Sequence, residues 1–248
     1  MTRPITRYSD TPSFPLFLTP CYVYPMTRIA RIVVPGVPHH VTQRGNRGER
    51  VFLGPQDYAL YRDWLAQSCR KFGVAVWAYC LMPNHVHLIL TPSDAAGMAL
   101  ALSRAHRLYA GYFNVRARQT GHLFQGRFGS VAMDEDHLMA AARYVALNPV
   151  RARLVERAED WPHSSVRAHL AGRDDALVEV RPLLERAPHF ADLIDAEPDE
   201  AAFVDLRRSE AIGRPLGSPA FVAEIERRLG RAVAPAKRGR KPKARGER

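Results

Sequence analysis

The alternation of hydrophobic and polar positions predicts short strands and longer helices over about the first 150 residues. Segments rich in β-branched and aromatic residues predict strands at residues 32–34, 39–43, 74–81 and 85–91. Apolar residues at helical spacing predict helices at residues 55–73, 93–113 and 134–148. The last of these should end at Asn148, because a residue that precedes proline disfavours the helical conformation.

The order of these elements predicts an α+β fold, with a small antiparallel sheet and helices packed on one face. Pro83 and Asn84 form the turn of a hairpin between two of the strands. After about residue 155 the pattern changes to helical segments broken by proline. We therefore expect an N-terminal extension at residues 1–25 and a main domain at residues 26–155. A small helical accessory region at residues 156–230 and a basic disordered tail at residues 231–248 should follow.

The charge of the chain indicates a polyanionic partner. Its 36 Lys and Arg exceed its 25 Asp and Glu, which gives a net charge of +11 over 248 residues. Nucleic acid is the first candidate partner, and an anionic membrane surface is the second. The tail carries eight Lys or Arg and one Glu, hence 8 − 1 = +7. Arg238, Arg240 and Lys241 lie in a segment similar to an AT-hook, but we favour general attraction to phosphate.

Composition also narrows the cellular location. The sequence contains no run of about 18 apolar residues, so we expect no transmembrane helix. Its three cysteines, Cys21, Cys69 and Cys80, have neither a paired framework nor a metal-binding spacing. A reducing cytoplasm, in association with the nucleoid, is the simplest location for such a chain.

Candidate chemistry begins with His85 and His87, which lie one residue apart on a predicted strand. Alternate side chains of a strand share a face, so the two imidazoles should stand roughly 6.6 Å apart at the backbone. Both can then bind one divalent metal ion. The alternative is a pair of surface histidines held by hydrogen bonds, and spacing alone favours that alternative.

Tyr144 and Asn148 are four residues apart on a predicted helix, so they share one helix face. If that face packs over the histidine strand, the Asn148 carbonyl oxygen can be a third metal ligand. The Tyr144 hydroxyl then lies beside the ion and can attack a phosphate. The alternatives are a tyrosine of the core and an asparagine at the end of a helix.

Five blocks of sequence give these residues a common context. The blocks, in order, are Pro38–Arg47, Met82–Leu88, Gly121–Phe128, Arg143–Ala152 and Trp161–Ser165. In these blocks the chain resembles the one-tyrosine HUH transposases, and within them the REP-associated tyrosine transposases. The resemblance extends from about Met26 to Leu170, with a weaker similarity at Gly213–Gly217.

The resemblance implies a fold, an activity and a set of site residues. It implies a ferredoxin-like domain, with His85, His87 and Asn148 as ligands of Mg²⁺ or Mn²⁺ and Tyr144 as the nucleophile. Members of the family cut single-stranded DNA near imperfect palindromic hairpins, leaving a 5′-phosphotyrosine and a free 3′-OH. Residues 26–155 would then be the catalytic domain. The resemblance implies neither a membrane partner nor a small-molecule substrate. Whether the protein acts as a monomer or a homodimer stays open, as does the choice of metal.

Several further residues are candidate DNA contacts or neighbours of the site. The DNA-contact candidates are Arg44, Asn46, Arg47, Arg127 and Arg151, with solvated surface side chains as the alternative. His39 or His40 could border the metal site, and an internally hydrogen-bonded strand histidine is the alternative reading of each. The function predicted from the sequence is a metal-dependent strand transferase on hairpin DNA. Its rival is a hairpin-binding regulator without catalysis.

Overall fold

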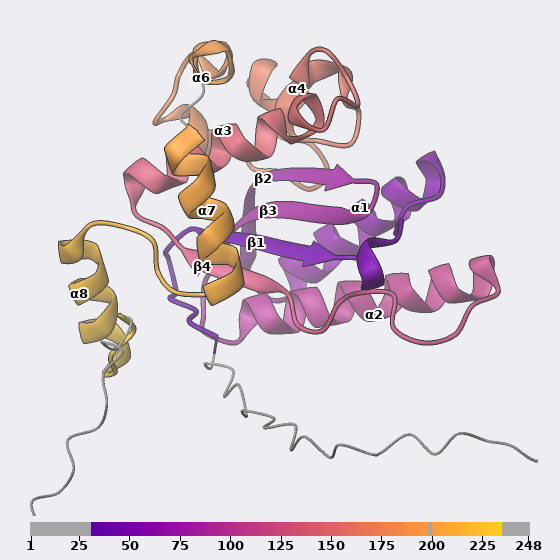
Figure 1. Ribbon diagram of the computed structural model, residues 1–248, viewed down its shortest axis with the longest axis horizontal. Helices are drawn as coiled ribbons and strands as arrows, with labels where there is room; N and C mark the ends of the chain where they lie inside the picture. The colour runs from indigo at the N-terminus through magenta and orange to yellow at the C-terminus, as the bar shows by residue number, and fades with distance from the viewer. Residues whose placement is uncertain (1–30, 198–199, 235–248) are drawn as a thin grey trace, which may run out of the picture. The chain divides into compact units, whose positions relative to one another are not determined.

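The computed structural model describes residues 31–197 and 200–234 (Figure 1). Its first six regular elements follow the order βαββαβ. They are β1 (His39–Arg44), α1 (Pro55–Lys71), β2 (Val74–Met82), β3 (His85–Pro92), α2 (Gly97–Ala117) and β4 (Gly129–Ala132). The strands pair antiparallel in the order β2-β3-β1-β4, which confirms the α+β class and the ferredoxin-like arrangement. Strand β4 lies where the sequence predicts a loop, because four residues give little periodic signal.

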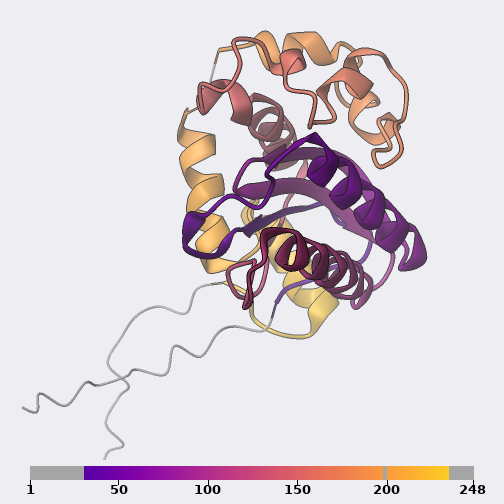
Figure 2. The same ribbon diagram turned by 90° about the vertical axis from the view of Figure 1, so that its right-hand side faces the viewer.

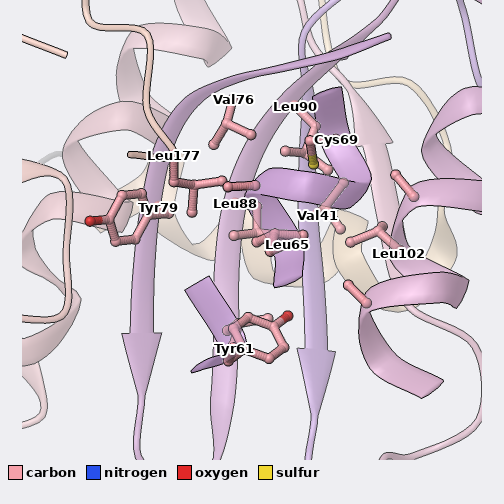
Figure 3. Close-up of a cluster of buried hydrophobic side chains, with 14 of the residues drawn as sticks. Val41, Tyr61, Leu65, Cys69, Val76, Tyr79, Leu88, Leu90, Leu102 and Leu177 are labelled. Atoms are coloured by element: carbon pink, nitrogen blue, oxygen red, sulfur yellow. The ribbon is translucent and has the colours of Figure 1, made fainter. Parts of the chain in front are cut away.

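Helices α1 and α2 cover one face of the sheet, as expected. Figure 3 shows Leu65 of α1 and Leu102 of α2 against Val41, Leu88 and Leu90 of the strands. All five of these side chains are fully buried. This layer buries alternate side chains of the strands, those that face α1 and α2.

The opposite face of the sheet is also covered, which differs from the expected one-sided packing. Helix α3 (Glu135–Arg151) lies there, with Leu138, Ala141 and Val145 against Cys80 and Ile89. The physical reason is the alternation of side chains along β2 and β3, since apolar residues occupy both faces of these strands. A sheet that is apolar on both faces needs a helical layer on each side.

Helix α3 begins at Asp134, whose carboxylate accepts a hydrogen bond from the His137 backbone N–H. The expected end at Asn148 was wrong, because the helix passes through Pro149 to Arg151. Proline this close to the C-terminus removes one N–H, and the last turn still closes. The carbonyls of Asn148 and Pro149 accept hydrogen bonds from the amides of Ala152 and Leu154.

The accessory region is helical, as predicted. Its helices are α4 (Val166–Leu170), α5 (Arg181–Leu184), α6 (Phe190–Asp195), α7 (Glu200–Ile212) and α8 (Pro219–Leu229). Two 3₁₀ turns complete the regular structure, at Asn46–Gly48 and Ala158–Asp160. Helix α7 lies beside α3 and the β1–β4 side of the sheet (Figures 1 and 2), and Phe203 and Leu206 join the α3 core.

Helix α8 packs separately, against Ile32 and Val34 before β1. None of the helices within 31–197 and 200–234 has the length and apolar character needed to cross a membrane. Two predicted segments lie outside the described residues, namely the extension at 1–25 and the tail beyond residue 234. The tail includes the candidate contacts Arg238, Arg240 and Lys241.

Candidate metal and tyrosine site

His85 and His87 project from the same face of β3, as their spacing predicts. Their ring centroids are 4.8 Å apart and the rings are nearly perpendicular. The His85 side chain is partly exposed, whereas His87 is 3% exposed. This is the face that α3 covers, because Ile89 continues the same side of the strand and packs in the α3 core.

Tyr144 reaches the histidines from α3. Its ring lies edge-on to His87, with centroids 5.4 Å apart, and it meets Phe203 of α7 at 5.3 Å. Burial raises the pKa of the Tyr144 hydroxyl, and nearby Glu210 raises it further. A hydrogen bond from Asn148 and the charges of Arg207 and Arg151 oppose that rise.

Asn148 lies one turn beyond Tyr144 and is 8% exposed, so helical spacing does bring these two side chains to one buried face. The hydrogen bond between them links the amide to the phenol. Across the contact between β3 and α3, Tyr144 thus lies against His87, which lies beside His85, and Asn148 lies one helical turn from Tyr144.

His40 on β1 also belongs to this cluster. Its Nε2 atom lies 3.1 Å from His87 Nδ1, and the two rings are stacked. Its Nδ1 atom lies 3.5 Å from Glu210 Oε1 on α7. The neighbouring His39 is bound within its own turn, since Nδ1 lies 2.8 Å from the Val37 carbonyl oxygen and Nε2 accepts from the Val34 N–H. Of the two candidate histidines, His40 is thus the one that borders the site.

The buried histidines are neutral at pH 7. Burial lowers the pKa of His40 to about 4, and burial with the charge of Arg44 lowers that of His85 to about 4. Burial also holds the pKa of His87 well below its usual value, and neighbouring His40, His85 and Arg44 act in the same direction. Neutral imidazole is the form that binds metal ions.

The donor set fits a divalent metal ion. The neutral imidazoles of His85 and His87 lie side by side, His87 lies against Tyr144, and the buried amide of Asn148 lies one helical turn from Tyr144. Ligand-capable atoms of His40, His87 and Glu210 also lie within 4.8 Å of one another. Among the described residues, buried His40 Nδ1 and Glu210 Oε1 make no hydrogen bond of regular geometry. Imidazole, amide and carboxylate ligands together suit ions such as Mg²⁺ and Mn²⁺.

The accessory region supplies two charged residues that the sequence analysis missed, Arg207 and Glu210 of α7. Burial raises the pKa of Glu210 to about 7, and the charges of Arg207 and Arg44 oppose that rise. Neither residue lies in one of the five sequence blocks. No local pattern could have assigned them to the site, because only the folding of α7 against β1 and α3 brings them there.

The candidate DNA contacts fall into different surroundings. Arg44 pairs with His85 across the strands, beside the site. Asn46 and Arg47 line a cavity of about 240 Å³ together with His122. Arg127 lines a second cavity, of about 600 Å³, which also includes His122.

Arg151 differs from these, because its guanidinium already has partners. Two of its nitrogens lie 2.6 and 3.2 Å from the Glu200 carboxylate oxygens. Its guanidinium carbon also lies 4.8 Å from the centre of the Phe203 ring. Arg151 therefore joins α3 to α7 in this structure, and the proposed contact with DNA would compete with that link.

Part of the chain is similar in sequence to known transposases. Residues 36–148 match the family model described as transposase IS200 like. Over 116 residues the chain is 25% identical to a REP-associated tyrosine transposase of Haemophilus influenzae. That alignment covers 42% of this chain and 66% of the relative, just under two thirds of its length.

Two solved structures are similar as well. One is described as a REP-associated tyrosine transposase bound to a REP hairpin. It has 21% identity and a TM-score of 0.49, and the match covers 62% of this chain and 93% of that one. The other is described as a transposase from Deinococcus radiodurans. It has 20% identity and a TM-score of 0.34, and the match covers 53% of this chain and 95% of that one.

Proposed function

We propose that the chain is a member of the IS200-like transposase family, whose model its residues 36–148 match, and that it cuts and rejoins single-stranded DNA beside hairpins with Tyr144 as nucleophile. The observation that supports this proposal best is the contact between the Tyr144 and His87 rings, 5.4 Å apart at their centroids. It sets the Tyr144 phenol ring against the neutral imidazole of His87, next to His85 on the same strand face, and a tyrosine beside metal-binding imidazoles suits attack on phosphate.

His85, His87 and Asn148 would hold Mg²⁺ or Mn²⁺. When bound, such an ion withdraws charge from a non-bridging phosphate oxygen. The Tyr144 oxygen attacks phosphorus, an O–P bond to tyrosine forms, and the bond from phosphorus to the 3′ oxygen breaks. The phenol loses its proton and the 3′ oxygen gains one, which leaves a 5′-phosphotyrosine and a free 3′-OH. The reverse attack by a 3′-OH rejoins strands without an external energy source, because each step exchanges one phosphoester for another.

The proposed substrate is single-stranded DNA that contains an imperfect palindromic hairpin. The Haemophilus relative carries the REP-associated name, and the similar solved structure is described with a REP hairpin. On this chain the net charge of +11 and the placement of Arg44 beside His85 support a polyanionic substrate at the site. Such a substrate places the protein with the nucleoid in the cytoplasm.

A denaturing gel tests the proposal. Full-length protein is mixed with labelled single-stranded DNA from hairpin repeats that flank its own gene, with Mg²⁺ or with EDTA. We expect a covalent protein–DNA adduct that needs Mg²⁺ and is lost in Tyr144→Phe. Tyr112→Phe is the matched control, because Tyr112 is a hydrogen-bonded tyrosine on α2, in the core on the other face of the sheet. An adduct that persists in Tyr144→Phe would exclude the mechanism.

The burial of Tyr144 favours a second candidate function. Its side chain is 7% exposed and lies against Phe203, so α7 covers the proposed nucleophile. A protein that keeps this cover closed would bind hairpins as a regulator without cutting them. Tight hairpin binding with no adduct in Mg²⁺ or Mn²⁺ would support this alternative.

A further inference from the structure

Asn84 controls the His85 ring. His85 Nδ1 lies 2.6 Å from Asn84 Oδ1, and Asn84 Nδ2 donates to the Gly48 carbonyl oxygen at 3.0 Å. The second bond orients the amide, because its NH₂ group must face the carbonyl and its oxygen must face the ring. A neutral His85 therefore carries its proton on Nδ1 and donates it to Asn84. The lone pair is left on Nε2, free to bind a ligand.

The His87 ring belongs to a longer series of polar contacts, which runs through His40 to Glu210. His87 Nδ1 and His40 Nε2 are 3.1 Å apart, so between two neutral rings one nitrogen must carry a proton and the other a lone pair. On its other side, His40 Nδ1 faces Glu210 Oε1 at 3.5 Å. In its ionised form the Glu210 carboxylate only accepts hydrogen bonds, so His40 then holds its proton on Nδ1 and accepts at Nε2. His87 then donates from Nδ1, and its lone pair is on Nε2.

We propose that His40 and Glu210 are positioning residues that hold His87 in the tautomer with a free Nε2, as Asn84 does for His85. The inference rests on the proposed function, because it takes His85 and His87 as metal ligands. It adds that separate hydrogen-bond networks fix the tautomers of the two ligands. The network for His85 comes from the hairpin turn, and the network for His87 comes from α7. Partners of this kind fix the ring and the tautomer of metal-binding histidines.

The burial of the second network supports this role. His40 and His87 are 0% and 3% exposed, so water does not replace either partner. The buried atoms His40 Nδ1 and Glu210 Oε1 are left without a regular hydrogen bond among the described residues. A side-chain shift of a few tenths of an ångström would close this gap into a hydrogen bond. Glu210 thus connects the accessory region to a ligand of the proposed metal.

Nuclear magnetic resonance of the metal-free, full-length protein tests the tautomers directly. Histidine ¹⁵N shifts distinguish a proton on Nδ1 from one on Nε2, and the spectrum is taken at about pH 8 to ionise the carboxylate. We expect both His85 and His87 in the Nδ1–H form. A His87 ring with its proton on Nε2 would overturn the proposal. The ¹⁵N measurement uses no variant and no DNA, so its result is independent of the outcome of the cleavage assay.

Two substitutions of Glu210 extend the test. Glu210→Gln keeps an oxygen that accepts from His40, whereas Glu210→Leu does not. We expect Glu210→Leu to lose the uniform His87 tautomer and to bind Mn²⁺ about 10- to 100-fold more weakly, with Glu210→Gln close to the parent. Glu200→Leu is the control on the same helix, because Glu200 contacts Arg151 and not the histidines.

The Mn²⁺ titration has two results that would contradict the proposal. An unchanged Mn²⁺ affinity in Glu210→Leu would show that the hydrogen bonds from α7 through His40 do not fix the tautomer of His87. A loss of binding in Glu210→Gln as complete as in His87→Ala would make Glu210 a ligand itself and not a positioning residue. Failure of the proposed function gives a different set of results. The histidine tautomers and the Mn²⁺ affinities would be as expected, but Tyr144→Phe would still form the DNA adduct.

Discussion

The ring of Tyr144 meets the ring of His87 edge to face, with the two planes at 87° and the centroids 5.4 Å apart. This contact joins α3 to β3, and therefore joins the proposed nucleophile to a proposed metal ligand. It is set by the packing of Leu138 and Ala141 on the strand side chains. A change in the α3 core would consequently alter the geometry of the chemistry as well as the stability of the fold.

Asn148 should contribute to metal binding. We expect Asn148→Ala to weaken Mn²⁺ binding about tenfold or more and to slow adduct formation, because it removes an oxygen ligand. Asn148→Asp should retain binding, because a carboxylate supplies the same oxygen. Titration calorimetry with Mn²⁺ measures the effect. Asn114→Ala is the control, since Asn114 is an amide of α2 whose side chain donates a hydrogen bond to the Gly121 carbonyl oxygen, away from the histidines. An unchanged Mn²⁺ affinity in Asn148→Ala would limit Asn148 to holding the phenol.

The core of the site followed from the sequence because its spacings are local. Alternation along β3 put His85 and His87 on one face, and helical spacing put Tyr144 and Asn148 on one face. Three of the four described strands, β1, β2 and β3, followed from the strand and hairpin patterns, and β4 did not. The packing of α3 over the histidine face was only a condition of the predicted site, and the fold meets it because the second face of the sheet is apolar.

What the sequence did not reveal depends on contacts between distant segments. Glu210 and Arg207 reach the site only because α7 packs against β1 and α3. His40 was distinguished from His39 by the face of β1 that each occupies, and two adjacent histidines look equivalent before the register is known. The prediction of the helix end at Asn148 was wrong for a related reason, because the outcome depends on which later amides donate hydrogen bonds to the last carbonyls of the helix.

The salt dependence of DNA binding should separate the candidate arginines. We expect Arg47→Gln and Arg127→Gln each to weaken binding of a single-stranded hairpin DNA and to lower the slope of log affinity against log salt by about 0.7. Arg151→Gln should leave the slope unchanged, since Glu200 already neutralises Arg151. Fluorescence anisotropy over a salt series gives the slopes. A fall in slope for Arg151→Gln as large as for Arg47→Gln would show that the pair opens on DNA.

Stability should fall on mild acidification, and His106 is one cause. Its Nε2 lies 3.0 Å from the Tyr61 hydroxyl, and burial lowers its pKa from 6.5 to about 4. Below pH 6.5 the unfolded chain takes up a proton that the folded chain excludes, so stability present above that pH is lost progressively towards pH 4. The loss for this one residue is about 3 kcal/mol at most.

Urea unfolding at several pH values in this window checks the prediction. We expect His106→Gln to be less sensitive to pH than the parent, because Gln does not titrate and still offers a partner to Tyr61. His122→Gln is the control, since His122 is exposed in a loop. Equal pH dependence in the parent and in His106→Gln would assign the acid sensitivity to other buried histidines, such as His39 and His40.

Phe203 on α7 should act as the cover of Tyr144. Its ring is 1% exposed and packs on the Tyr144 ring, while the neighbouring Val204 is 52% exposed. We expect Phe203→Ala to lower the free energy of unfolding by about 3 kcal/mol, because it leaves a cavity in the α3 core, and Val204→Ala to change it by less than about 0.5 kcal/mol. Loss of the ring should also admit solvent to Tyr144 and raise its rate of nitration, mapped by mass spectrometry. Nitration of Tyr144 that is equally fast in the parent and in Phe203→Ala would mean that α7 already opens in solution, and the regulator without cleavage would lose its structural support.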